Sequence, residues 1–175
     1  MSQVLLLDTN VWSHLLLAEP TQRARVQTRL RELAALYPGA TRATSRICIA
    51  EALVGARRLA DAQARRNAEA ALQAEFANPN LLIVEITDKV AGSDEQVFDT
   101  AAALRGDALR TAALQGGTSA GADGGRLKLP DAIVAASCLA FSPPAVLVTE
   151  NVADFRWTTP GSAGVTVAGL TVEKL

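Results

Sequence analysis

Short, continuously apolar runs alternate along the chain with longer segments in which apolar residues recur every three or four positions. The runs are typical of strands buried on both faces, and they lie at residues 4–7 and 145–148. Residues 81–86, which are rich in β-branched side chains, predict a further strand. A brief extended piece at Ala43-Thr44 and a last strand at 165–167, on an edge, complete the expected sheet. Strands that alternate with helices predict an α/β fold, a three-layer α/β/α sandwich around a central, mostly parallel sheet.

Helical spacing, capping residues and breakers predict five helices between these strands. The first of these helices follows Asp8-Thr9-Asn10. The other four run from Pro20 to Pro38-Gly39, from the cap Ser45 to Phe76, from the cap Thr87 to Leu114, and from Pro130-Asp131 to Ala140. Residues 116–125 (GGTSAGADGG) are expected to form a loop. Their glycines follow a helix rather than a strand and lack a Gly-Lys-Ser/Thr, so they do not form a nucleotide-binding loop.

The composition indicates which residues form the core and in which compartment the protein is expected. Apolar residues make up 49% of the chain and aromatics 4%, so Ala, Leu and Val must build the core of one domain, expected to span residues 1–175. Cys48 and Cys138 lie among apolar residues without metal-ligand spacing, which predicts buried, reduced thiols. No apolar run approaches the length of a membrane span, and no basic segment precedes the first one. We therefore expect a cytoplasmic protein with no membrane partner.

The net charge of −1 conceals an uneven distribution. Between Arg23 and Arg66 there are ten arginines against three acids. If carboxylates elsewhere bind metal, the remaining surface is mildly basic and would suit a polyanion. An Arg-rich helix face is more often simply solvated or salt-bridged, however, so charge alone identifies no partner.

Acidic residues occur where strands end and helices begin. Asp8 directly follows the first strand, and Asn151 and Asp154 follow the strand at 145–148. Asp131 lies in the first turn of a helix, and Glu51 lies about a turn and a half into another. Because functional groups of an open parallel sheet gather beyond the carboxyl ends of its strands, these acids are expected to meet at one rim.

Clustered carboxylates raise one another's pKa, and a hard divalent cation relieves that conflict. Oxygen ligands indicate Mg²⁺ or Mn²⁺ rather than zinc, for which one histidine and two scattered cysteines leave little. Such a site suits phosphodiester hydrolysis. Taken singly, an Asp before a helix is usually a cap and a helical Glu is usually solvated. Glu51 is the least ordinary of them, because it lies in an otherwise apolar helix where a lone carboxylate is costly to bury.

Four segments together resemble the PIN-domain ribonucleases, specifically the VapC type of toxin from bacterial type II toxin–antitoxin pairs. They are LLLDTNVW with Asp8, TSRICIAEALVG with Glu51, LPDAIVAASCLA with Asp131, and VLVTENVADF with Thr149, Asn151 and Asp154. Their order across residues 4–155 fits the family throughout, whereas the stretch at about 91–125 departs from compact members as a possible helical and Gly-rich extension.

The resemblance implies a PIN-like sandwich, an RNA substrate, Mg²⁺ or Mn²⁺ as the metal, an antitoxin that inserts a basic side chain near the acids, and usually a homodimer. It also implies that Asp8, Glu51 and Asp131 are catalytic metal-site acids. The fourth position falls to Asp154 or Asn151, and the greater charge of a carboxylate favours Asp154. Thr149 would position its neighbours or the attacking water.

Three other classes of protein compete with the nuclease. A haloacid-dehalogenase-like phosphatase also begins with a strand ending in Asp, but it needs a second Asp where this chain has Asn10. A response-regulator receiver should carry an N-terminal acidic pair and a Lys after its last core strand, and neither is evident. A catalytically silent PIN-like binding module is the third alternative.

His14, the only histidine, could act as a base, but a hydrogen-bonded or surface role is the commoner one.

Overall fold

Five parallel strands form the central sheet of the computed structural model, which describes residues 3–114, 127–157, 165–166 and 170–175. In spatial order the strands are β3 (Leu81–Val84), β2 (Thr41–Ser45), β1 (Val4–Leu7), β4 (Val146–Thr149) and β7 (Thr171–Lys174). Leu5, Leu6 and Leu7 are all buried, as expected for a central strand that is covered on both faces.

The order of the strands reverses at the middle of the sheet. From β1 the chain proceeds outward through β2 to β3, and it then returns to the other side of β1 to add β4 and β7. In an open parallel sheet, the crevice beyond the carboxyl ends of the two strands at such a reversal is the usual place for a functional site. The reversal lies between β1, which ends at Leu7, and β4, which ends at Thr149.

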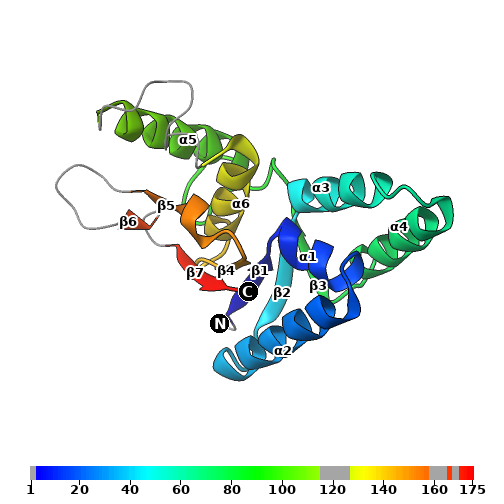
Figure 1. The fold of residues 1–175 in the computed structure, drawn as a ribbon. Helices are drawn as coiled ribbons and strands as arrows, with labels where there is room; N and C mark the ends of the chain where they lie inside the picture. The colour runs from blue at the N-terminus through cyan, green and yellow to red at the C-terminus, as the bar shows by residue number, and fades with distance from the viewer. Residues whose placement is uncertain (1–2, 115–126, 158–164, 167–169) are drawn as a thin grey trace.

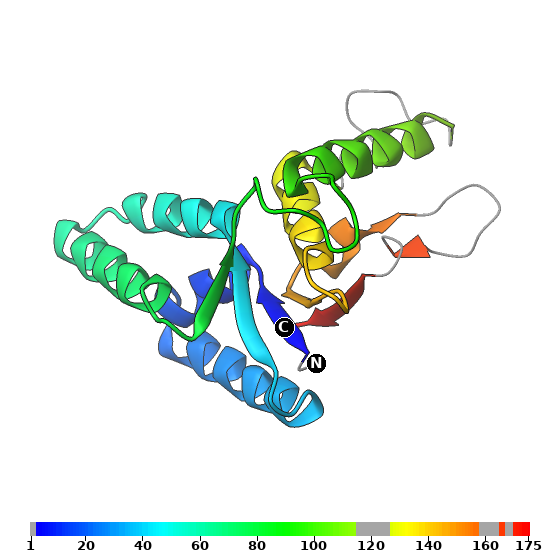
Figure 2. The ribbon, with the colours of Figure 1, turned by 180° about the vertical axis from the view of Figure 1, so that it is seen from behind.

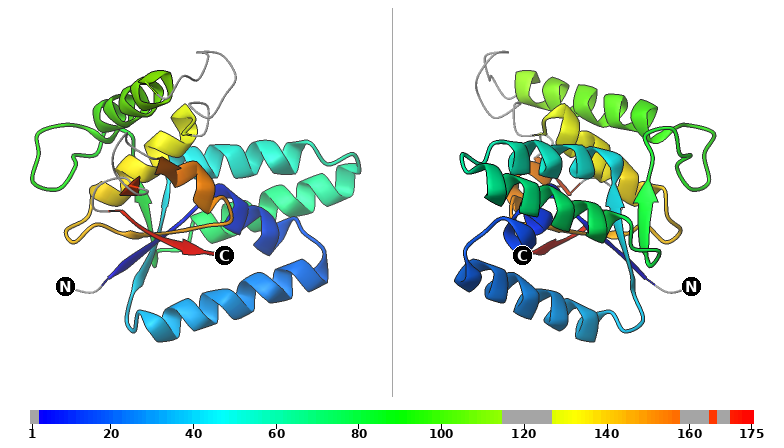
Figure 3. Two further views of the ribbon diagram at one scale, coloured as in Figure 1. Left: turned by 60° about the vertical axis from the view of Figure 1, so that its left-hand side comes forward. Right: turned by 90° about the vertical axis from the view of Figure 1, so that its right-hand side faces the viewer.

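Helices cover both faces of the sheet. They are α1 (Thr9–Leu16), α2 (Pro20–Leu36), α3 (Arg46–Arg57), α4 (Ala62–Phe76), α5 (Val97–Leu114) and α6 (Leu129–Leu139). Helix α2 lies on one side of the sheet and the contacting pair α5 and α6 on the other (Figures 1 and 3). Helices α3 and α4 run side by side as a hairpin (Figure 2). The predicted three-layer α/β/α sandwich is confirmed.

Helix α1 is fixed against the sheet by Trp12, whose side chain is buried. The indole Nε1 donates a hydrogen bond to Thr44 Oγ1 (3.0 Å), and Thr44 in turn donates to the carbonyl of Leu7 (3.0 Å). The indole also meets the ring of Phe76 edge-on at 5.2 Å. These contacts join α1, α4, β1 and β2 directly beneath the point where Asp8 leaves the sheet.

Two predicted helices have different bounds in the structure. The helix expected from Ser45 to Phe76 is interrupted after Arg57, because Asp61 caps a new helix by accepting a hydrogen bond from the N–H of Ala64 (2.6 Å). The helix expected from Thr87 begins only at Val97. The intervening segment forms turns, including Gly92 at a φ of +78°, which favours glycine. The possible extension at 91–125 therefore contains helix α5, packed on α6, and residues 115–126 lie outside the described part.

The strand predicted at 165–167 is present at Val165–Thr166, but its predicted place at an edge of the main sheet is wrong. Val165–Thr166 (β6) pairs with Arg156–Trp157 (β5) in a separate antiparallel ribbon, and residue 167 is outside the described residues. The main sheet has β3 at one edge and β7 at the other, and the two charged residues in the sequence TVEK of β7 hide its strand pattern. Its Glu173 accepts hydrogen bonds from Tyr37 and Arg29 on the α2 side, both at 3.0 Å. None of the helices in the described ranges is long and apolar enough to span a bilayer.

Candidate active site

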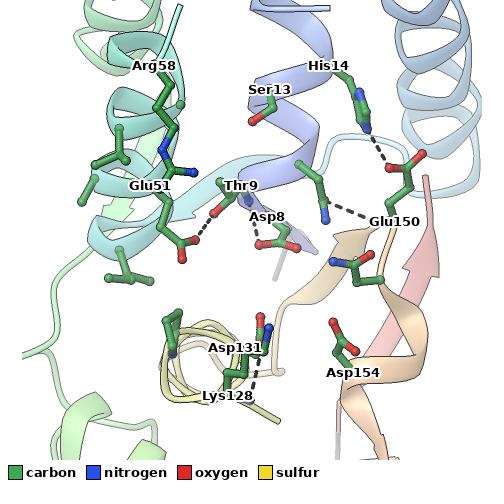
Figure 4. Close-up of a pocket in the computed structure, with 17 residues that line it drawn as sticks. Asp8, Thr9, Ser13, His14, Glu51, Arg58, Lys128, Asp131, Glu150 and Asp154 are labelled. Atoms are coloured by element: carbon green, nitrogen blue, oxygen red, sulfur yellow. Dashed lines mark hydrogen bonds and ion pairs between the residues drawn. The ribbon is translucent and has the colours of Figure 1, made fainter. Parts of the chain in front are cut away.

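A pocket of about 800 Å³ opens beyond the carboxyl ends of β1 and β4. Its walls come from α1, α3, the start of α6 and the segment that follows β4 (Figure 4). All four predicted metal-site acids line it, and they are Asp8, Glu51, Asp131 and Asp154. Segments more than a hundred residues apart in the chain thus meet at the reversal of the sheet, where the strand pattern predicts a site.

Asp8 is the most buried of the four acids, with 6% of its surface exposed. It caps α1, accepting a hydrogen bond from the N–H of Thr9 (2.6 Å) through one carboxylate oxygen and from the hydroxyl of Thr149 (2.7 Å) through the other. Burial raises the pKa of Asp8, the two hydrogen bonds oppose that rise, and the negative charge of Glu51 adds to it. Asp8 is therefore both a helix cap and a buried carboxylate facing other acids.

Glu51 projects from the second turn of α3 toward Asp8. Its carboxylate accepts a hydrogen bond of 2.5 Å from the hydroxyl of Thr9, the residue that follows Asp8. Thr9 thus connects the two acids, with its backbone on one and its side chain on the other. Sequence reasoning treated Thr9 as a capping residue only. The local sequence pattern cannot show that Thr9 also donates to Glu51, because that contact depends on how α1 and α3 pack.

Asp131 is the acid whose pKa is affected by all three of the others. It lies in the first turn of α6 and accepts a hydrogen bond from the N–H of Lys128 (3.2 Å). The pKa of Asp131 is raised from 3.8 to about 6, first by burial and then by the negative charges of Asp154, Asp8 and Glu51. All three other acids therefore act on Asp131 through space, as expected for carboxylates that share one pocket.

Asp154 and Asn151 both line the pocket, and both follow β4. Asp154 lies within a short 3-10 helix, Val152–Phe155 (η2), and its N–H donates to the carbonyl of Asn151 (3.0 Å). Phe155 is fully buried and anchors this turn, as predicted. The choice between Asp154 and Asn151 as fourth ligand stays a prediction based on charge.

Thr149 and Asn10 hold the segment after β4 in place. Besides donating to Asp8, the Thr149 hydroxyl accepts hydrogen bonds from the N–H of Asn151 (3.1 Å) and from the side-chain amide of Asn10 (3.5 Å). Asn10 also accepts from the N–H of Glu150 (3.3 Å), and Glu150 pairs with His14 at 2.7 Å. His14 is thus hydrogen-bonded at the rim of the pocket, as expected of its commoner role. Glu150 and Asn10 are positioning residues that sequence reasoning missed.

The donor set fits a hard divalent cation. The acidic side chains offer oxygen ligands, which suit Mg²⁺ or Mn²⁺, and a cation would offset the repulsion that raises the pKa of Asp131. The cysteines are buried free thiols, and burial raises the pKa of Cys48 to about 12, so thiolate ligation of zinc is disfavoured. Within the described ranges, no three His, Cys, Asp or Glu side chains converge closely enough to hold an ion as they stand.

Fold and pocket define a parallel α/β protein with an acidic site at the reversal of its sheet. The family model of the PIN domain matches residues 5–146. The chain belongs to the PIN-domain family. This assignment decides against the haloacid-dehalogenase-like and receiver alternatives. No curated protein matches the chain.

Several solved structures share the fold at low sequence identity. VapBC2 from Rickettsia felis, bound to a DNA fragment from its promoter, is 20% identical with a TM-score of 0.53, and 98% of each chain is covered. DNA-bound VapBC from Salmonella typhimurium is 20% identical with a TM-score of 0.55 and the same coverage. FitAB bound to an IR36 DNA fragment is 19% identical with a TM-score of 0.58, covering 98% of this chain and 94% of that one. The family model thus confirms the PIN-domain family, and the chain shares its fold with chains of these VapBC and FitAB structures.

Proposed function

We propose that this protein is a metal-dependent endoribonuclease and the toxin of a type II toxin–antitoxin pair. The observation that carries the proposal is that four carboxylates line one pocket, where burial and then the charges of the other three acids raise the pKa of Asp131. Membership of the PIN-domain family supports the nuclease class. The chains that share its fold include VapBC and FitAB proteins, which supports the toxin–antitoxin assignment.

In this proposal Asp8, Glu51, Asp131 and Asp154 hold Mg²⁺ or Mn²⁺. When bound, the metal lowers the pKa of a coordinated water and neutralises charge on the phosphoryl oxygens. Thr149 fixes the orientation of Asp8 through its 2.7 Å hydrogen bond, and Thr9 fixes that of Glu51 at 2.5 Å. A carboxylate left partly free of the metal accepts the proton of the attacking water. Such positioning matters because small displacements of ligands and nucleophile strongly reduce rates.

The partners proposed from the resemblance are a cytoplasmic RNA, a cognate antitoxin and a second copy of the chain. An antitoxin that places a cationic side chain among these acids would offset the same repulsion that a metal ion offsets. It would thereby compete with the metal and keep the nuclease inactive. Which RNA is cut is best established by sequencing the 5′ ends of cellular RNA after brief induction.

The test is cleavage of RNA by purified, partner-free protein. We expect cleavage with Mg²⁺ or Mn²⁺, none in EDTA, and recovery when the metal is restored, because the carboxylates alone neither activate water nor neutralise the phosphate. Full activity in EDTA would contradict the metal mechanism. RNA binding without cleavage under any metal would instead favour the catalytically silent binding module.

A further inference from the structure

Two cationic side chains border the acidic pocket. Arg58 is the C-cap residue of α3 and extends toward the pocket above Glu51 (Figure 4). Lys128 is the N-cap residue of α6 and lies beside Asp131. Both are exposed, and they come from different walls of the pocket. An anionic substrate approaching four carboxylates therefore passes two positive charges at the rim.

Neither cation is neutralised by the acids nearby. Elsewhere on α3, Arg57 pairs with Glu69 and Arg46 pairs with Glu85. Arg58 and Lys128, by contrast, form no ion pair with any residue that the structure describes, although both line the same pocket as the acids. Their charges are thus available to a ligand at the mouth of the site.

We infer that Arg58 and Lys128 bind neighbouring backbone phosphates of the RNA and so position the strand over the carboxylates. This inference rests on the proposed function and adds residues that none of the four quoted segments assigns. A guanidinium can engage two phosphate oxygens at once, whereas an ammonium acts as a point charge. Contacts of this kind do not depend on base sequence. They offset the repulsion between an RNA strand and the acids before the chemical step.

The test is equilibrium binding of a fluorescent, mixed-sequence, 12-nucleotide single-stranded RNA, with Mg²⁺ present. The parent protein carries Asp8→Asn, which prevents cleavage under the proposed mechanism. Losing one phosphate contact on a single strand lowers the slope of log affinity against log salt by about 0.7, which is about fivefold in affinity at about 0.1 M salt. We expect that effect from Arg58→Gln and from Lys128→Gln, and about twice the change in slope from the pair.

Matched variants separate phosphate binding from damage to the fold. Arg25→Gln removes an exposed arginine from α2, away from the pocket, and should leave the affinity and the salt slope unchanged. Arg58→Lys keeps the charge, so its salt slope should equal that of the parent, whereas the slope for Arg58→Gln should be lower. Melting temperatures of all the variants should match that of the parent, because both side chains are exposed.

The outcomes distinguish this inference from the proposed function. If the parent binds RNA and the double variant binds it equally well with the same salt slope, the inference is wrong and the nuclease proposal stands. The inference is also wrong if Arg25→Gln weakens binding as much as Arg58→Gln does. If the parent does not bind RNA and the wild-type protein does not cut it, both proposals fail.

Discussion

The raised pKa of Asp131 predicts that removing its charge stabilises the metal-free protein. The folded-state pKa, about 6, lies above the ordinary value of 3.8. Between these values the folded protein retains a proton that the unfolded chain has lost, so the free energy of unfolding falls as pH rises through this window. At pH 7 the full penalty is present, and at about pH 4 most of it is absent. Asp131→Asn should therefore raise the melting temperature at pH 7 and scarcely change it at pH 4.

The size of the effect follows from the same two values. A rise of about two in pKa corresponds to at most about 3 kcal/mol, since each unit is worth about 1.4 kcal/mol. Asp131 is partly exposed, and solvent screening reduces this to about 1 kcal/mol. For a domain of this size that free energy corresponds to about 2–4 °C. Asparagine keeps an oxygen that can accept the hydrogen bond from the N–H of Lys128.

The assay is thermal unfolding in EDTA across the pH range, repeated with Mg²⁺. Added Mg²⁺ should stabilise the wild-type protein more than the variant, since the variant offers the ion one charge fewer. Asp61→Asn is the matched control, because it makes the same change at the exposed cap of α4, outside the pocket. A variant that melts at or below the wild-type temperature at pH 7 would refute the reasoning. So would a gain in stability that is independent of pH.

Two further predictions concern the rim of the pocket. Asp154→Asn should raise the Mg²⁺ concentration needed for cleavage more than Asn151→Ala does, because a hard cation gains more from a carboxylate than from an amide; the reverse order in a metal titration would exchange the two roles. His14→Gln should leave the cleavage rate within a few-fold, because His14 is hydrogen-bonded to Glu150 and the metal activates the nucleophile. A loss as deep as that of Asp8→Asn would make His14 a catalytic base instead.

Much of the fold was predictable because its signals are local. A continuously apolar run such as 4–7, too short for a buried helix, indicates a buried strand. The caps at Asp8 and Ser45 coincide with the observed starts of helices. The break before Asp61 was missed because alanine favours helix on both sides of it. Strand β7 was missed because its charged residues obscure the apolar pattern and are satisfied only by distant partners such as Tyr37.

The candidate site likewise has a part that could be predicted from the sequence and a part that could not. That the four acids line one pocket could be expected from the sequence, because strand ends in a parallel sheet, and the helix starts that approach them, share one edge. The contacts that orient them could not, since Thr9 reaches Glu51, and Asn10 reaches Thr149 and Glu150, only once helices and strands are packed. Nor could the sequence show that Arg58 and Lys128 form no ion pair among the described residues, because ion pairing depends on which acids the fold brings within reach.

The central claim, that these carboxylates hold the metal that cuts RNA, is tested most directly by Asp8→Asn. The substitution preserves size and capping ability and removes one charge from the most buried acid. The measurement is RNA cleavage in Mg²⁺ by the variant and the wild-type protein, each confirmed to be folded by its melting temperature in EDTA. We predict that cleavage is lost while the melting temperature is unchanged or slightly higher. Normal cleavage by a folded Asp8→Asn protein would contradict the account.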